Sequence, residues 1–121
     1  MKVFVAGSRK FTKEFEEAMK KFEDSGIPAL HGNKNIDSER DTLGTVKSDN
    51  ERMFKRIDDS DVVFVIAKDG YVGYSVAMEL GYAYAKGKDI ISSEEIKELS
   101  VRNLVSKMMN LEDFIKYLIG D

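Results

Sequence analysis

Residues 73–88 carry the clearest sign of chemistry in the chain, a carboxylate near the start of a helix rich in small residues. They read GYSVAMELGYAYAKGK, and the carboxylate is Glu79. An apolar run at residues 61–67 precedes them and ends in a glycine-containing loop at residues 68–74. In an open α/β sheet, ligands bind where strands run into helices at their carboxyl ends. Glu79 is therefore a candidate nucleophile or general base, and the alternative is an acidic first-turn residue favoured by the helix dipole.

A second candidate is the turn formed by Gly7, Ser8 and Arg9, which joins an apolar run at residues 2–6 to a helix. The free N–H groups and the dipole at a helix N-terminus attract phosphate, and Ser8 and Arg9 would add hydroxyl and guanidinium donors. The spacing of a Walker A loop is missing. The turn is therefore either a phosphate site or simply a tight connection.

Further polar and aromatic residues belong to loops at the same end of the predicted strands. His31, Tyr71 and Tyr74 could stack on a ligand ring or donate a proton. Candidates for binding the substrate or its phosphate lie around the start of the glutamate-bearing helix: Asp69, Gly73 and Ser75. The small residues of this helix would let a ligand approach the backbone, and the alternative is that they only allow close packing on the sheet.

Apolar runs and capped, amphipathic segments alternate along the chain. The runs that predict strands are residues 2–6, 28–31, 61–67, 89–92 and 104–109. Helices are predicted over residues 12–25, 48–59, 75–87, 92–99 and 111–119, each with a Ser, Thr or Asn at or just before its start that can cap the first turn. Residues 32–47 are polar and have no clear period, which predicts a long loop that is functional or mobile.

This alternation predicts a parallel sheet with right-handed crossovers. The order 2-1-3-4-5 is typical of five strands of this kind, so the expected fold is a flavodoxin-like (Rossmann-like) three-layer α/β sandwich. That order brings four segments to one edge of the sheet: residues 7–10, 31–34, 68–75 and 92–93. The candidates above therefore share an edge, whereas Asp61, at the opposite end of its strand, is expected to be structural.

Composition narrows the classes of function. The 121 residues are expected to form a single domain, residues 1–121. The absence of cysteine excludes thiolate catalysis and disulfides, and a single histidine argues against a zinc site. A net charge of −3, with 34% charged residues of both signs, disfavours nucleic-acid binding. No apolar run is long enough to cross a membrane, so we expect a cytoplasmic protein whose partner is a small molecule.

The segment from Met78 to Lys88, together with the apolar run before it, resembles the nucleoside 2-deoxyribosyltransferase family, which includes the 2′-deoxynucleoside 5′-phosphate N-hydrolases. In that family the glutamate of this motif attacks C1′ of the sugar and releases the base, and the resemblance gives this role to Glu79. A covalent glycosyl intermediate suits a carboxylate. The resemblance also implies that no metal or organic cofactor is needed, and that the protein is a homodimer in which a neighbouring subunit completes the pocket.

The chain departs from the family pattern at three positions, of which one is Arg9, shifted by one position relative to the arginine in the Gly-Ser-x-Arg loop of the hydrolase branch. The family has an aspartate that positions or protonates the substrate, eight residues before the aspartate that leads into the strand, and the matching residue here is Met53. Asp49 lies one helical turn earlier on the same face and is our candidate for the missing carboxylate. The hydrolase branch has a phosphate-binding serine where this chain has Gly73, with Ser75 nearby.

Two functions remain open from the sequence. The first is cleavage or transfer at the N-glycosidic bond of a (deoxy)nucleoside or its 5′-monophosphate, with hydrolysis favoured because the turn at residues 7–9 suits a phosphate. The second is a non-catalytic nucleotide-binding or sensing domain that has lost the reaction, and Met53 favours it. The N-terminal segment also resembles Rossmann-like nucleotide-binding domains related to lysine decarboxylase-like and DNA-processing proteins, although the Pro-Gly-Gly-x-Gly-Thr motif of many of them is absent.

Overall fold

A parallel sheet forms the centre of the fold. The computed structural model describes residues 1–32 and 42–120 of the chain. In this part of the chain five parallel strands lie in the order β2-β1-β3-β4-β5, which confirms the predicted order. They are β1 (Val3–Gly7), β2 (Ala29–His31), β3 (Val62–Ile66), β4 (Asp89–Ser92) and β5 (Lys107–Met108). β1 and β3 are buried along their whole length, which explains why their sequences do not alternate.

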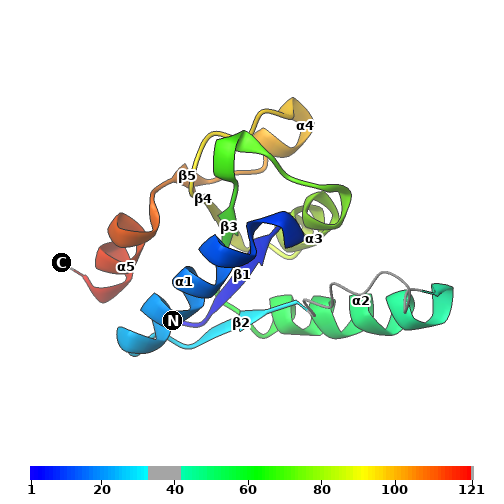
Figure 1. Ribbon diagram of the computed structural model, residues 1–121, viewed down its shortest axis with the longest axis horizontal. Coiled ribbons are helices and arrows are strands. Elements are labelled where there is room, and N and C mark those ends of the chain that lie inside the picture. The colour runs from blue at the N-terminus through cyan, green and yellow to red at the C-terminus, as the bar shows by residue number, and fades with distance from the viewer. Residues whose placement is uncertain (33–41, 121) are drawn as a thin grey trace.

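Helices cover both faces of the sheet and complete the three-layer architecture. They are α1 (Thr12–Asp24), α2 (Leu43–Asp58), α3 (Tyr74–Ala85), the short α4 (Leu99–Arg102) and α5 (Leu111–Ile119). Figure 1 shows α1 and α5 on one side of the sheet and α2 and α3 on the other. Two 3-10 turns, η1 (Arg9–Phe11) and η3 (Lys68–Gly70), follow β1 and β3. Among the described residues, no helix has the length and apolar character needed to span a membrane.

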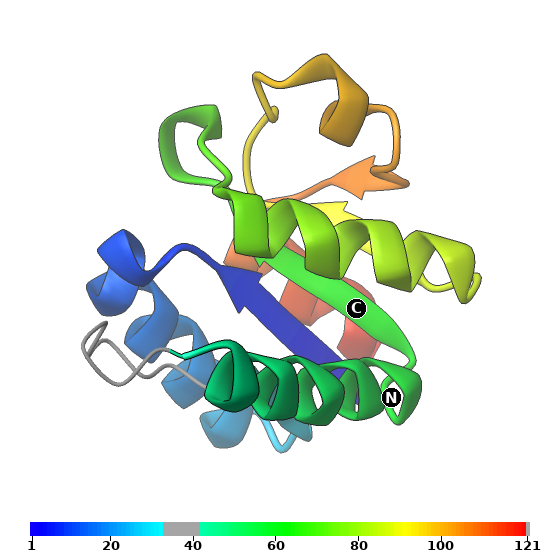
Figure 2. The ribbon, with the colours of Figure 1, turned by 90° about the vertical axis from the view of Figure 1, so that its right-hand side faces the viewer.

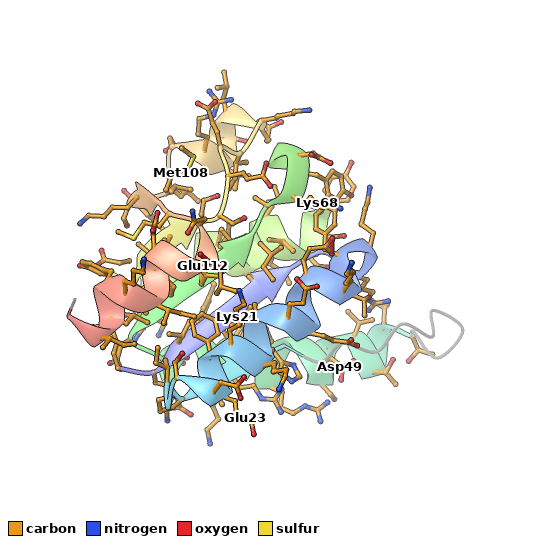
Figure 3. The ribbon with its side chains drawn as sticks, turned by 60° about the vertical axis from the view of Figure 1, so that its left-hand side comes forward. Lys21, Glu23, Asp49, Lys68, Met108 and Glu112 are labelled. Carbon is orange, nitrogen blue, oxygen red and sulfur yellow. The ribbon has the colours of Figure 1, made fainter. Side chains whose placement is uncertain are left out.

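Each face of the sheet carries its own apolar core. Under α1 and α5, the ring of Phe64 contacts Phe22 edge-on at 6.1 Å and stacks on Phe114 at 5.0 Å. At the surface of this layer, Lys21 of α1 faces Glu112 of α5, with Nζ 3.4 Å from Oε1 (Figure 3). The opposite core joins β1 and β3 to α2 and α3 and includes Phe4, Ile57, Val63 and Leu80. Packing on both faces holds the strand ends in fixed positions.

The loops that could form a site gather at one edge of the sheet. Figure 2 shows α2 and α3 side by side, with their N-terminal ends on the side to which the β1 arrow points. The helices therefore begin where the parallel strands end, as the expected topology requires. Every segment that follows a carboxyl end of β1, β3 or β4 reaches this edge.

The helix α2 begins earlier than the sequence predicts. Its N-cap is Thr42, and not Ser48: the Thr42 hydroxyl accepts a hydrogen bond from the Thr45 amide at 3.2 Å, and the Thr45 hydroxyl accepts one from the Thr42 amide at 2.9 Å. This reciprocal pair is a capping box with threonine at the third position, in place of the usual Glu or Gln. The predicted loop at residues 32–47 is therefore wrong from Leu43 onward, and its residues 33–41 lie outside the described residues.

Two other predicted caps are also wrong. Ser8, and not Thr12, accepts the capping hydrogen bond after β1, from the Lys10 amide at 3.3 Å, because η1 intervenes before α1. The Thr12 hydroxyl instead donates to the Arg9 carbonyl at 2.7 Å. The helix α3 begins at Tyr74 with Gly73 as its N-cap and without a side-chain cap, so Ser75 lies within its first turn.

The region after β4 differs most from the prediction. Ser92 ends β4, and its hydroxyl donates to the Glu94 carbonyl, so it does not cap a helix over residues 92–99. The helix here is α4, capped by Glu98, whose carboxylate accepts from the Ser100 amide at 3.0 Å. This interaction is also the largest of the effects that lower the pKa of Glu98. The strand β5 is confined to Lys107–Met108, within the predicted residues 104–109.

Candidate active site

A cavity of about 430 Å³ opens at the carboxyl edge of the sheet. Three parts of the chain wall it: the turn after β1, one face of α2, and the start of α3. The predicted site residues that line it are Gly7, Ser8, Arg9, Asp49, Gly73, Tyr74, Ser75 and Glu79. The structure thus brings together eight predicted residues from three segments that are far apart in sequence, around a volume suited to a small molecule.

Glu79 is the buried acidic residue of this cavity. Its side chain comes from the second turn of α3, and the residue is only 7% exposed. A Cβ atom built on Gly32 would lie 3.7 Å from the Glu79 Oε1 atom and 3.4 Å from the Met53 Cγ atom. The carboxylate of Glu79 therefore lies near Gly32, at the end of β2, and near the side chain of Met53 on α2. Acidic residues are rarely buried to this extent without a role in structure or chemistry.

The turn after β1 provides the polar wall next to Glu79. Gly7 is needed for packing, because a Cβ there would lie 3.3 Å from the Ile66 Cβ on the neighbouring strand. Ser8 is half-buried and caps η1, and Arg9 is exposed at the cavity. A hydroxyl and a guanidinium group at the edge of a cavity form a suitable environment for an anion.

The start of α3 lies beside the same wall. Its N-cap, Gly73, offers no side chain to the first-turn amides, which have no acceptors within the helix. Ser75 is exposed in this first turn and lines the cavity. The helix dipole and these amides favour a negatively charged group here.

The face of α2 forms the opposite wall. Asp49 lines the cavity with its side chain 22% exposed, and its Oδ1 atom lies 2.5 Å from the Nη2 atom of Arg52. Met53 lies one turn further along the helix and is buried. Asp49 therefore shares the cavity with Glu79, as its proposed role requires, while its carboxylate is held by a neighbouring guanidinium group.

Three predicted site residues do not line this cavity. His31 faces α1, where its ring packs edge-on against Phe15 at 5.4 Å and its Nδ1 atom lies 2.5 Å from the Gly32 carbonyl. The Tyr71 ring packs against Phe11 and lies under the Lys10 ammonium group, 3.7 Å from the ring centre. Asp69 is exposed in η3 with a left-handed φ of 57°. In each case local packing or turn geometry sets the direction of the side chain. This direction does not follow from the position of the residue in a loop.

Besides Met53, five residues that line the cavity were not expected as site residues: Gly32, Val46, Asn50, Val76 and Met78. Val46, Asn50 and Met53 follow one another at intervals of four and three residues, the spacing of one helix face. Because this helix is predicted to begin at residue 48, Val46 is assigned to a loop, and the helix face that it shares with Asn50 and Met53 is not recognised. The pair Thr42 and Thr45, which forms a capping box, is the sequence feature that could have indicated the earlier start of this helix.

The loop before α3 is fixed to the rest of the edge. Lys68 of η3 forms an ion pair with Glu14 of α1, with Nζ 3.0 Å from Oε1. This contact holds the pKa of Glu14 below its ordinary value and raises the pKa of Lys68. Gly70 has a φ of 78°, and its carbonyl accepts a hydrogen bond from the Lys97 amide at 3.0 Å. Contacts from two sides therefore position the segment that leads into α3.

Within residues 1–32 and 42–120, no group of three or more His, Cys, Asp or Glu side chains is arranged to hold a metal ion. The polar side chains that line the cavity are instead two carboxylates, hydroxyls, a guanidinium and an amide. Such a set can bind an anionic, polar ligand and attack an electrophilic carbon.

The fold and the cavity define a class, a flavodoxin-like α/β domain with a ligand-sized cavity at the carboxyl ends of its strands. Among solved structures, the chain is similar to a 2-deoxyribosyltransferase from Bacillus psychrosaccharolyticus, with a TM-score of 0.78 and 21% identity over 97% of this chain and 92% of that one. It is also similar to a conserved protein from Enterococcus faecalis V583, with a TM-score of 0.66 and 14% identity over 99% and 98% of the two chains. No protein-family model and no curated protein matches the chain.

These likenesses extend over nearly the whole chain and show its fold. The fold that the motif at residues 78–88 implies is thereby confirmed.

Proposed function

We propose that this protein cleaves the N-glycosidic bond of a (deoxy)nucleoside or its 5′-monophosphate, with Glu79 as the nucleophile. The observation that carries the proposal is the burial of Glu79 in a cavity at the carboxyl edge of a fold shared with a 2-deoxyribosyltransferase. A carboxylate can attack C1′ of the sugar through an oxocarbenium-like transition state and form a covalent intermediate. Water then releases the sugar in hydrolysis, and a second base accepts it in transfer.

Hydrolysis of a monophosphate is the branch that we favour. Its support is the position of Ser8 and Arg9 at one wall of the cavity, next to the uncapped start of α3 at Gly73 and Ser75. A 5′-phosphate bound between these groups would hold the sugar near Glu79. The chemistry of the donors, a guanidinium, hydroxyls and helix N–H groups, suits a phosphate better than a neutral group.

Asp49 is proposed to take part in positioning the substrate. It shares the cavity with Glu79, and its ion pair with Arg52 fixes its side chain. The rival function, a nucleotide-binding domain without activity, is favoured by the thioether of Met53, which cannot donate or accept a proton where the family has an aspartate. Both functions use the same cavity, so only an activity measurement separates them.

A homodimer is the proposed assembly. The support is a set of exposed apolar side chains that line the cavity, where Tyr74 is 99% and Val46 37% exposed. Met78, at 38%, extends this set along α3. Side chains of this kind are seldom left in water when they lie together, and a second subunit would cover them. Light scattering should then give twice the mass of the chain, and a monomer at micromolar concentration would contradict the proposal.

The activity test uses a panel of 2′-deoxynucleosides, ribonucleosides and their 5′-monophosphates, with free base followed by chromatography. The proposal predicts release of free base from at least one compound, faster for the monophosphate than for the nucleoside. A second free base added to the reaction distinguishes transfer, which forms a new nucleoside, from hydrolysis. Measurable nucleotide binding without release of base from any compound would favour the rival.

A further inference from the structure

Asn50 lies in the wall of the cavity, and no other described residue forms a hydrogen bond with its side-chain amide. It is half-buried on α2 and lines the cavity. Its side chain makes no hydrogen bond to any residue within 1–32 or 42–120. Its neighbour Asp49 differs, because its carboxylate is bound to Arg52 at 2.5 Å. An amide with one acceptor and two N–H donors at a cavity wall is a group that a ligand can use.

Asn50 lies close to Met53, the residue that stands where the family has an aspartate. Asn50 precedes Met53 by one turn of α2, so the two side chains share a face of the helix. Met53 is close to the same glycine as the Glu79 carboxylate, at 3.4 Å from the Cβ position on Gly32. The amide of Asn50 therefore lies on the wall where the family places its aspartate. No described residue accepts a hydrogen bond from its N–H groups.

The reaction requires a donor at the departing base. When a Glu79 oxygen forms its bond to C1′, the C1′–N bond breaks and the electron pair leaves with the base nitrogen. A hydrogen bond to an acceptor atom of the base stabilises the negative charge that develops there. Neither the thioether of Met53 nor an ionised Asp49 can donate such a bond.

We propose that Asn50 donates a hydrogen bond from Nδ2 to the departing base and so assists its departure. This inference rests on the proposed N-glycosidic cleavage. Asn50 keeps its own protons, and water supplies the proton that the released base takes up. A second water attacks C1′ of the glycosyl intermediate, transfers its proton to solvent, and regenerates the Glu79 carboxylate.

The experiment compares leaving groups in wild type and Asn50→Ala. The two substrates are the best natural substrate of the wild type and its activated analogue, either a 7-methylated purine or a 5-fluorinated pyrimidine nucleotide. An activated base departs with little help. We expect Asn50→Ala to lower kcat/KM roughly ten- to hundredfold for the natural base, the effect of a charge-assisted hydrogen bond, and less than about threefold for the activated one.

Two further variants make the comparison specific. Ser48→Ala, an exposed change on the same helix outside the cavity, should leave both rates unchanged. Asn50→Asp keeps the shape of the side chain but removes its donors at neutral pH, so its loss on the natural base should equal or exceed that of Asn50→Ala. Circular dichroism checks that each variant is folded, as an alanine at an accessible helix position should be.

The outcomes separate the inference from the function on which it depends. A loss that is confined to the natural base supports the role of Asn50. An equal loss on both substrates, or a smaller loss for Asn50→Asp than for Asn50→Ala, overturns the role and leaves the function of Glu79 standing. If the wild type releases base from neither substrate, the proposed function is overturned together with this inference.

Discussion

The two ends of helix α3 carry similar chemical groups in different settings. At its C-terminal end, the Tyr82 hydroxyl donates to both carboxylate oxygens of Asp58, at 2.8 and 2.9 Å. The Lys86 ammonium lies 3.7 Å from the same carboxylate, and the ring of Tyr82 stacks on Phe54 at 4.3 Å. At the N-terminal end, Glu79 is 7% exposed and lines a cavity of about 430 Å³.

The comparison separates a structural cluster from a candidate site. Asp58, Tyr82 and Lys86 bind one another at the surface and hold α2 against α3, which is a sufficient reason for their presence. Placing a carboxylate such as that of Glu79 in a largely buried position costs free energy that the fold has to offset. A buried acid that borders an open volume is a candidate to bind or act on a ligand, which the variants below test.

The largest effect is expected for Glu79→Gln. Because the amide cannot act as the nucleophile, kcat should fall on the order of a thousandfold or more, while nucleotide binding stays within a few-fold of the wild type. Steady-state kinetics and calorimetry measure the two quantities. Tyr82→Phe, at the other end of α3, is the control and should retain its kcat. Wild-type activity in Glu79→Gln would assign the nucleophile to another residue.

Gly70→Ala tests whether the loop before α3 is as rigid as its contacts indicate. An added Cβ would lie 2.7 Å from the Glu95 carbonyl at a φ of 78°, so strain and overlap together should lower the free energy of unfolding by about 3 kcal/mol or more. The matched control is Gly81→Ala within α3, where a Cβ meets nothing within 4 Å and helix propensity improves. Urea denaturation measures the free energy of unfolding of both variants. Equal values would show that the loop can rearrange to accommodate the added methyl group.

Arg9→Ala tests the assignment of the anion site. Loss of a charged hydrogen bond should weaken monophosphate binding by about 1.5–3 kcal/mol, with little effect on the unphosphorylated nucleoside. Titration calorimetry with both ligands measures the difference. Equal weakening of nucleoside and nucleotide would mean that the turn at residues 7–9 is structural and that the phosphate binds elsewhere.

The smallest effect is expected at the C-terminal end of α3. The hydrogen bond to Asp58 is the largest of the effects that raise the pKa of Tyr82 above its ordinary value. The stabilisation by the neutral hydroxyl is thus fully present below the unfolded pKa near 10 and is lost as pH rises through the folded value. Tyr82→Phe should lower stability slightly at neutral pH and remove part of the alkaline decline, as followed by thermal unfolding from pH 8 to 11. An unchanged alkaline decline would show that the Tyr82–Asp58 contact does not contribute to stability.

The centre of the sheet could be predicted from the sequence because β1 and β3 are apolar runs of five residues, separated from the other strands by helix-length segments. Within the predicted runs, Val3–Gly7 and Val62–Ile66 are buried on both faces, and such runs have few alternatives to central parallel strands. Glu79 could be found for a related reason. Its place after the strongest strand puts it at the carboxyl edge whatever the details of the loops are.

The parts that could not be predicted depend on local hydrogen bonding. Because of the capping box between Thr42 and Thr45, the N-cap of α2 lies six residues before the predicted Ser48. Asn50 is therefore in the body of the helix, where it lines the cavity, and not in the predicted first turn. His31 turns toward Phe15, although its strand ends at the expected edge. Periodicity does not determine such side-chain directions, which follow from packing with distant segments.

The most direct test of the account is the covalent intermediate itself. The protein is incubated with its best substrate, quenched in acid and digested with trypsin, which releases residues 69–86 as one peptide because Lys68 and Lys86 are the adjacent cleavage points. The account predicts that this peptide gains the mass of the sugar moiety and that fragmentation places the gain on Glu79. The gain should be absent from Glu79→Gln. Steady release of base without any adduct at Glu79, or with an adduct at Asp69, the other acidic residue of the peptide, would contradict it.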